Sequence, residues 1–343
     1  MPTVEVSPVH HPEQQECCCS SSASSARWHR RTRHRCPVPH RCPVPTSPRT
    51  THRSYQATGS NPRADAITRV DFDGNLDATD NWESLPSHAT PAHVYWSVIE
   101  TDTHAFLTYG FFHPRDYARV CLPVVCHEND FEGALLTVRK GGPGQPFGTL
   151  VLVQTVAHLG VETDRHPTMV ADPDDGHLRP ALFIEAGGHG VHTLRGHDPD
   201  PDRTFVYRPG AVADTPGDDG PMPAAASLRY TLLSIETELW ARRSLTGPNG
   251  LFNKDTTARG ARYEMSGIPL EFNGNNFLGA SKPQAPWGWR AGHGLHPGEI
   301  FLDPALAVSR LGLDEGAFSL TYVRNPFLDP GQMTGAAARA AAQ

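Results

Sequence analysis

One imidazole and three carboxylates lie within the six residues 127–132, in the segment Cys-His-Glu-Asn-Asp-Phe-Glu-Gly. Asp130 and Glu132 are two residues apart, and side chains at that spacing on a strand project to one face. Two carboxylates on a partly buried face repel each other unless a cation lies between them. With His127 beside them, they predict a divalent-metal site. Oxygen ligands favour Ca²⁺, Mg²⁺ or Mn²⁺, and the imidazole also admits Zn²⁺.

A fourth predicted ligand, Asp116, follows an aromatic segment that ends in the turn Phe-His-Pro-Arg-Asp. His113 and Asp116 are then at the end of a strand, where binding residues often lie. The alternative interpretation of Asp116 is a turn cap. For the carboxylates of residues 127–132, the alternative is a solvated acidic face.

Two further histidines follow apolar segments, which could present their imidazoles to a shared cleft. His158 ends the run Val-Leu-Val-Gln-Thr-Val-Ala, and His189 lies in a Gly-Gly-His-Gly element shortly after Glu185. Glycines around His189 permit unusual dihedral angles and the close approach of a ligand. Both histidines could be ligands, or could serve as catalytic bases beside a metal-bound water. An ordinary core or surface position is the alternative for each.

Alternating acidic residues from Asp71 to Asp77, with Gly74 among them, resemble part of a calcium-binding loop. The bidentate Glu of an EF-hand is missing, because position 82 is Trp. A second ion site and an acidic turn therefore both remain open.

Short segments rich in β-branched and aromatic residues, separated by Gly, Pro and Asp clusters, recur after residue 66. The strands predicted from them are two within 92–113 around a turn at residues 101–102, and others at 131–139, 148–157, 181–186, 203–207 and 318–323. Helices are predicted only at 228–242 and 304–311. This pattern predicts a mainly β fold, an antiparallel β-sandwich with helical and loop insertions.

Charge and composition divide the chain of 343 residues into three parts. Residues 1–61 are a Ser-, Arg-, Pro- and Cys-rich segment, which we predict to be a disordered basic tail. Residues 1–60 hold eight Arg and three Glu, a charge of +5, so the total of −7 leaves −12 for the remainder. We predict one β-sandwich metal-binding domain at 62–330 and a flexible Ala-rich tail at 331–343.

The same composition argues against several classes of protein. An acidic body is unlike a nucleic-acid binder, and the absence of an apolar run of ~18 residues predicts no membrane span. The N-terminus has no apolar stretch typical of a secretory signal. Cys121 and Cys126 are five apart on a predicted strand, should face opposite sides and are not expected to pair. Together these features favour a cytoplasmic location, and the oligomeric state stays open.

The pattern His127-x-x-Asp130-x-Glu132 resembles the metal-binding heptapeptide Gly-His-Arg-His-Asp-Trp-Glu of the necrosis- and ethylene-inducing cytolysin-like family. In that family an aromatic strand and a Lys-Asp turn precede the heptapeptide, and the turn Asp is also a ligand; Asp116 occupies the similar place here. This chain has Cys126 where the heptapeptide begins with Gly, and Asn129 in place of its second His.

A fungal vacuolar-sorting-associated family and related bacterial proteins share the order of an acidic strand, a strand ending in His and a Gly-His-Gly element. Residues 157–159 and 188–190 are similar to the last two, so the resemblance covers about residues 66–210. It implies metal binding. Membrane damage is not expected to carry over, since the cytolysins are secreted and have disulfides.

Two classes of function follow. The first is a metal-dependent binding module, in which the ion joins the protein to a small molecule, a sugar or a lipid head group. The second is a metal-dependent hydrolase, in which a metal-bound water is activated and His158 or His189 shuttles the proton. An ion with a purely structural role is a third interpretation.

Overall fold

The computed structural model describes residues 51–77, 80–117, 127–141, 148–158, 160–217, 227–243, 262–265, 268–271, 286–288, 297–312 and 317–328. All of them belong to one compact unit, Ser47–Gln343. The predicted tail at 331–343 and the two cysteines Cys121 and Cys126 lie outside the described residues, as does most of the tail at 1–61. For His127 and Glu128 the backbone alone is described.

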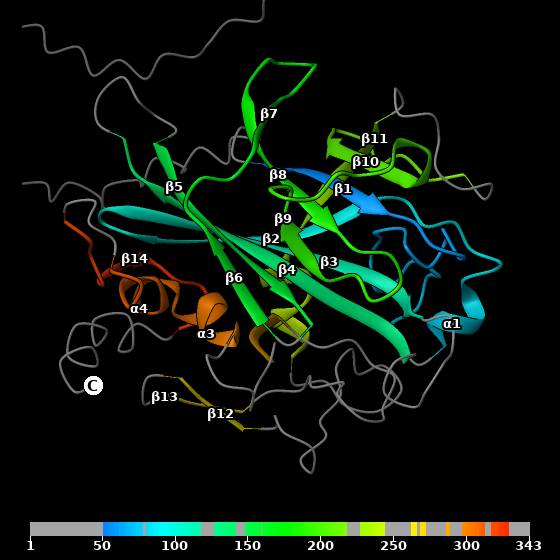
Figure 1. The fold of residues 1–343 in the computed structure, drawn as a ribbon. Coiled ribbons are helices and arrows are strands. Elements are labelled where there is room, and N and C mark those ends of the chain that lie inside the picture. The colour runs from blue at the N-terminus through cyan, green and yellow to red at the C-terminus, as the bar shows by residue number, and fades with distance from the viewer. Residues whose placement is uncertain are drawn as a thin grey trace, which may run out of the picture. The chain divides into compact units, whose positions relative to one another are not determined.

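Strands dominate the described residues, which confirms the mainly β prediction (Figure 1). The strands are β1 (Arg53–Ala57), β2 (His93–Thr101), β3 (His104–Asp116), β4 (His127–Arg139), β5 (Thr149–Ala157), β6 (Gly160–Asp164), β7 (Met169–Ala171), β8 (Leu178–Ile184), β9 (Val191–Thr193), β10 (Thr204–Pro209), β11 (Leu228–Ser234), β12 (Arg262–Met265), β13 (Ile268–Glu271) and β14 (Tyr322–Arg324). The helical segments are α1 (Asn81–Ser84), η2 (Pro201–Arg203), α2 (Ile235–Glu238), η3 (Trp240–Arg242), η4 (Pro286–Gly288), α3 (Pro297–Leu302) and α4 (Pro304–Ser309). Within the described residues, no helix is both apolar enough and long enough to span a bilayer.

Twelve of the strands form one sheet whose order is β6-β5-β4-β3-β2-β11-β10-β1-β8-β7, with β14 on β2 and β9 on β8. The run from β2 to β6 is antiparallel, as predicted. The sheet as a whole is mixed, because β1 pairs with β8, β10 with β11, and β11 with β2 in parallel. The first strand, β1, also lies N-terminal to residue 62, where the sequence predicts the domain to begin.

The predicted helix at 228–242 is wrong over its first half. Residues 228–234 form β11, which inserts between β10 and β2 and is paired in parallel with both. Leu228 and Tyr230 are buried while Arg229 between them is exposed, the alternation of a strand. The hydroxyl of Ser234 then caps the short helix α2 by accepting the Thr237 N–H. Backbone pairing on both sides thus outweighs the helical propensity of the leucines.

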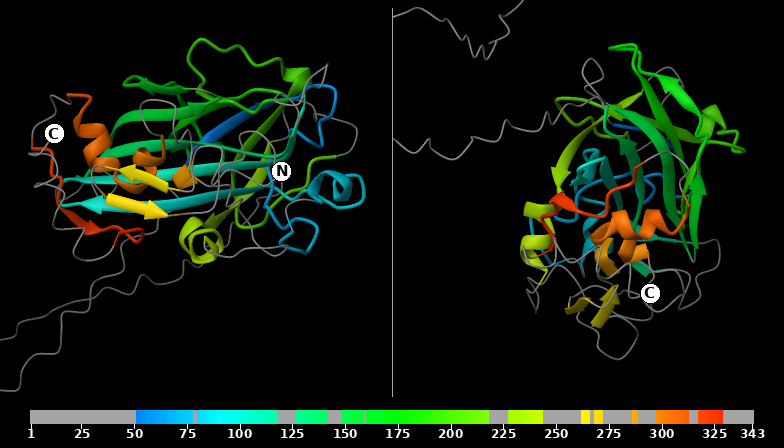
Figure 2. Two further views of the ribbon diagram at one scale, coloured as in Figure 1. Left: turned by 90° about the horizontal axis from the view of Figure 1, so that it is seen from below. Right: turned by 90° about the vertical axis from the view of Figure 1, so that its left-hand side faces the viewer.

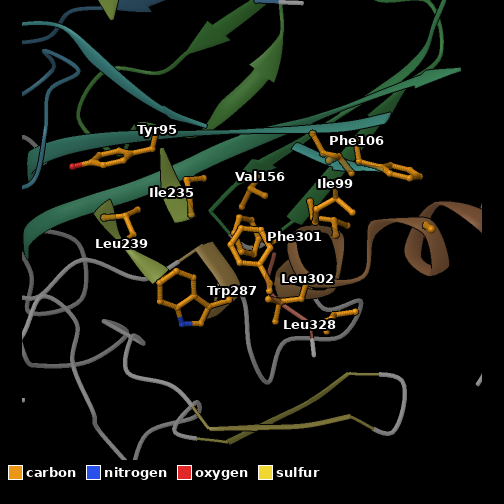
Figure 3. Close-up of a cluster of buried hydrophobic side chains, with 14 of the residues drawn as sticks. Tyr95, Ile99, Phe106, Val156, Ile235, Leu239, Trp287, Phe301, Leu302 and Leu328 are labelled. Carbon is orange, nitrogen blue, oxygen red and sulfur yellow. The ribbon is translucent and has the colours of Figure 1, made fainter. Parts of the chain in front are cut away.

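Two apolar cores lie on opposite faces of β2–β5. The inner core joins these strands to β8–β11, so the sheet folds back over itself; its members include Val94, Leu107, Leu136, Ile184 and Tyr207. The outer core lies between the other face and the helical segments α2, η4, α3 and α4, as Figures 2 and 3 show. Its side chains include Tyr95, Ile99, Phe106, Val156, Trp287 and Phe301.

The folded sheet is closed on one side by side chains that join β6 to β9. His192 Nδ1 lies 2.9 Å from Glu162 Oε1, and the Thr193 hydroxyl donates to Asp164 Oδ2 at 3.0 Å. The end of β3, the start of β4, the start of β6 and the loop before β9 lie close together, which is where the predicted site residues gather.

Candidate functional site

The register of β3 and β4 brings the predicted ligands to one end of the sheet. Asp116 lies opposite His127, His113 opposite Asp130, and Phe111 opposite Glu132. Because alternate residues of a strand share a face, His113, Asp130 and Glu132 project on the same side as the inner core. The predicted common face of Asp130 and Glu132 is thus present in the fold.

Backbone conformation marks the same region. In the described part of the chain, the non-glycine residues with positive φ are Asn129 at 60°, His158 at 45° and His189 at 51°. Such conformations are costly for L-residues and persist where surrounding contacts hold them, often at functional sites. At Asn129 the contact is a hydrogen bond of 2.7 Å from Asn81 Nδ2 of α1. The three positions flank the predicted ligands Asp130 and Glu132.

His189 is fully buried and lies between two carboxylates. Its Nδ1 is 3.1 Å from Asp130 Oδ2, and its Nε2 is 3.1 Å from Asp65 Oδ1. Burial alone would lower the pKa of this imidazole, but the hydrogen bonds and charges of Asp130 and Asp65 outweigh it and raise the pKa to about 9. An imidazolium with two N–H donors satisfies both carboxylates.

Asp65, which is not among the site residues predicted from the sequence, is completely buried and accepts hydrogen bonds from several segments. Its Oδ2 accepts the Gly59 N–H at 2.8 Å and the Tyr117 hydroxyl at 2.6 Å. Its Oδ1 accepts the Gly187 N–H at 2.8 Å in addition to His189. A sequence signal does exist, since this Asp lies inside the short apolar run Ala-Asp-Ala-Ile, where a carboxylate needs partners to be buried.

His113 stacks on His189 and is also fully buried. Its Nε2 donates to Gln56 Oε1 at 2.9 Å, and Gln56 Nε2 donates to the Glu185 carbonyl at 2.9 Å. Burial, and next the charge of His189, lower the pKa of His113 well below its usual value, so this imidazole is neutral. It packs against the charged ring and links it to β1 and the end of β8.

His158 lies at the solvent-exposed edge of the site, with 51% of its side chain accessible. Its Nε2 is 2.6 Å from Glu185 Oε2, and its backbone N–H donates to Glu132 Oε1 at 3.0 Å. The hydrogen bond to Glu185 is the largest cause of a raised pKa; burial opposes it, and the charges of Glu185, Asp130 and Asp116 add to it. Residues on β3, on β4 and in the loop after β8 therefore act on the histidine that follows β5.

Two glycines make room for the pair formed by His158 and Glu185. A Cβ at Gly188 would lie 2.9 Å from His158 Cε1, and one at Gly190 would lie 3.0 Å from both Glu185 Oε2 and His158 Nε2. The hydrogen bond to His158 also lowers the pKa of Glu185, against the effect of burial. The other carboxylate oxygen of Glu185, Oε1, lies 3.2 Å from His192 Nε2 and extends the hydrogen-bond network to β9. The Gly-Gly-His-Gly element thus shapes the site both through His189 and through its glycines.

The described side chains include no group of three or more His, Cys, Asp or Glu with the geometry to hold a metal ion. The His127 side chain is outside that set, so the four-ligand site stays a prediction. In the acidic loop at 71–77, two carboxylates have partners nearby in the chain. Asp71 pairs with Arg69 at 2.6 Å, and Asp73 accepts a hydrogen bond from the Asn75 side chain at 2.8 Å.

No protein-family model and no curated protein matches the sequence. Solved structures of the necrosis-inducing family are similar over about half of the chain. One is a toxin fold for microbial attack and plant defence, with 14% identity, a TM-score of 0.27, and coverage of 47% of this chain and 59% of that one. NLPPya in complex with glucosamine aligns with 15% identity, a TM-score of 0.24, and coverage of 49% and 59%.

Necrosis and Ethylene inducing Protein 2, from the causal agent of cocoa's witches' broom disease, aligns with 20% identity, a TM-score of 0.22, and coverage of 42% and 51%. The chain therefore spans between half and three fifths of the length of these proteins. They belong to the family that the motif around His127 resembles.

Proposed function

We propose that this protein binds a divalent cation at the edge formed by Asp116, Asp130 and Glu132 together with His127, and uses the cation to hold a small-molecule ligand. The observation that carries the proposal is the convergence of these carboxylates on His158. Glu132 accepts its backbone N–H at 3.0 Å, and the charges of Asp130 and Asp116, after the hydrogen bond to Glu185, raise the pKa of its ring.

The donor atoms of the site fit a cation. Asp116 and Asp130 both act on His158, and Asp130 and Asp65 act on His189, so acidic oxygens from several segments gather in one region. Carboxylate oxygens suit Ca²⁺, Mg²⁺ or Mn²⁺, and His127, as a fourth ligand, would bring Zn²⁺ within range.

The exposed position of His158 suits ligand binding. Its Nε2 is engaged by Glu185, which leaves Nδ1 for a ligand in solvent. A sugar or a lipid head group offers hydroxyl oxygens that can complete the coordination of a hard cation. A solvent-exposed position such as that of His158 suits the binding module, whereas a hydrolase requires an available base next to the ion.

Titration calorimetry of the protein with CaCl₂, MgCl₂ and MnCl₂ tests the cation site. We expect one ion to bind the wild type, and Asp130→Asn and Glu132→Gln to weaken it at least 10-fold. Asp102→Asn is the matched control, because it removes one exposed carboxylate from the turn between β2 and β3, at the opposite end of β3 from Asp116, and should leave the affinity unchanged. Equal binding by the wild type and both site variants contradicts the proposal.

Matched sugars test the ligand. Glucosamine, whose amine complements the carboxylates, and glucose, its neutral counterpart, are titrated with and without EDTA. The proposal expects sugar binding that requires the cation. Sugar binding that persists in EDTA would show that the cation does not take part in holding the ligand.

The second candidate is the metal-dependent hydrolase, and the pair formed by His158 and Glu185 is the observation that favours it. His189 is less suited to shuttle a proton, because both of its nitrogens are engaged by carboxylates. Chromogenic esters, phosphate esters and glycosides, each assayed with Mn²⁺ and with EDTA, separate the classes. Turnover that needs the metal and is lost in His158→Gln supports the hydrolase.

A further inference from the structure

We propose that Asp65 and His189 are positioning residues that hold Asp130 in its ligating orientation and thereby set the affinity of the cation site. This inference rests on the proposed function. Neither residue needs to touch the cation, since His189 acts on Asp130 and Asp65 acts on His189.

The three side chains form a line from the protein interior to the edge of the site. Asp65 and His189 are fully inaccessible, and 12% of the Asp130 side chain is accessible. The two contacts to the imidazole are each 3.1 Å. Because both nitrogens are engaged, the ring has one orientation, and one oxygen of Asp130 always faces an N–H. Mutation of a partner of this kind behind a metal-binding carboxylate typically lowers metal affinity 10- to 100-fold.

Asp65 also fixes the backbone that carries His189. It accepts the N–H of Gly187, two residues before the histidine, and the hydroxyl of Tyr117 at the end of β3. The Tyr117 N–H in turn donates to the Gly187 carbonyl at 3.1 Å. The end of β3, which carries Asp116, is therefore tied to the loop that carries His189.

The partners of Asp65 explain why a carboxylate occupies this position. The backbone N–H groups of Gly59 and Gly187, the Tyr117 hydroxyl and the His189 ring all act as donors to it. An asparagine would place its NH₂ group against two of these donors. A buried group whose partners are mismatched forces its neighbours to move.

Asp65→Asn and Asp303→Asn form the test pair. Asp303 is also completely buried, and it accepts the hydroxyl of Tyr322 in the helical layer, outside the site. Both variants are titrated with MnCl₂, and the melting temperature of each is recorded. Asp65→Asn should weaken Mn²⁺ binding at least 10-fold, whereas Asp303→Asn should keep wild-type affinity even if it melts earlier.

A second variant covers the case in which Asp65→Asn does not fold. His189→Asn tolerates the left-handed backbone of that position but is too short to span both carboxylates, so it should weaken Mn²⁺ binding similarly. Hydrogen exchange adds a readout without metal: the amides of Gly59 and Gly187 should exchange faster in Asp65→Asn than in the wild type.

The outcomes separate the two proposals. Wild-type affinity in Asp65→Asn or in His189→Asn overturns the positioning role and leaves the cation site in place. Equal losses in Asp65→Asn and Asp303→Asn also overturn it, because a general loss of stability then explains both. A wild type that binds no Mn²⁺, Ca²⁺ or Mg²⁺ overturns the proposed function and this inference together.

Discussion

The imidazoles of His113 and His189 stack with their centroids 3.8 Å apart and their planes 3° from parallel, yet their charge states differ. Burial lowers the pKa of His113 well below 6.5. Burial acts on His189 in the same direction, but Asp130 and Asp65 raise its pKa to about 9. At neutral pH a neutral ring therefore lies flat on a charged one, and the two rings titrate in different ranges.

His189 should make the stability of the fold fall at high pH. Its pKa is about 9 in the folded protein against 6.5 for an ordinary histidine side chain, so its contribution to stability is complete below pH 6.5 and is lost as pH rises through 9. This pKa difference corresponds to a contribution on the order of 3 kcal/mol to the free energy of unfolding. Urea unfolding in EDTA between pH 6.5 and 10 measures it. His189→Asn should lose this part of the pH dependence; a variant with the wild-type slope would contradict the assignment.

His52 should make the fold sensitive to acid. Its ring is packed against Tyr109, Phe111 and Tyr230 at centroid distances of 4.6, 5.1 and 5.1 Å. Burial, with a smaller effect of the Arg179 charge, lowers its pKa to about 3. A lowered histidine pKa means that the unfolded chain takes up the proton first.

Because the unfolded chain is protonated first, acid favours the unfolded state. Stability is lost as pH falls below 6.5, by about 1.4 kcal/mol for each pH unit, until the folded-state pKa is reached. His52→Phe should flatten the unfolding free energy between pH 6.5 and 4.5 relative to the wild type. Parallel curves for the two proteins would show that this ring does not account for the acid sensitivity.

Gly190→Ala should separate His158 from Glu185. The new Cβ would lie 3.0 Å from each side chain, and these side chains are partly exposed and can move. With its main hydrogen bond weakened, the pKa of His158 should fall back toward 6.5. Histidine titration by NMR measures the shift. Gly217→Ala is the control, because nothing lies within 4 Å of a Cβ there.

Gly110→Ala should destabilise the junction of β3 and β4. A Cβ at this position would lie 2.6 Å from Phe131 Cε1 and 2.8 Å from Cζ, in the outer core. Overpacking of this kind costs about 1–3 kcal/mol, which thermal unfolding can detect. Adding Phe131→Leu should recover part of the loss, since the two substitutions share one space. Strict additivity of the two losses would argue against the clash.

The sequence predicts most of the strands that carry the site. Alternation and turn residues locate β2, β3, β4 and β5 to within a few residues, and the spacing of Asp130 and Glu132 places them on one face. The helix at 304–311 is also confirmed, as α4. These predictions succeed because they depend on local periodicity, which the chain alone contains.

Long-range pairing explains what the sequence does not reveal. Residues 228–234 become a strand because β10 and β2 lie on either side of them. Asp65 matters because its donors come from residues near 59, 117 and 188, which only the folded sheet brings together. His158 and His189 share the features expected of site residues, but their different burial and partners depend on the tertiary structure.

The central place of β11 has a consequence for synthesis of the chain. β11 lies between β10 and β2 and pairs with both. The sheet therefore has a gap between β10 and β2 until residue 234 has left the ribosome. Before that point, β2–β6 can form an antiparallel meander that already carries Asp130 and Glu132, but no strand pairs its β2 edge to the strands on either side of His189. A nascent chain stalled before β11 should therefore expose its inner core to chaperones, and the site should assemble late in translation.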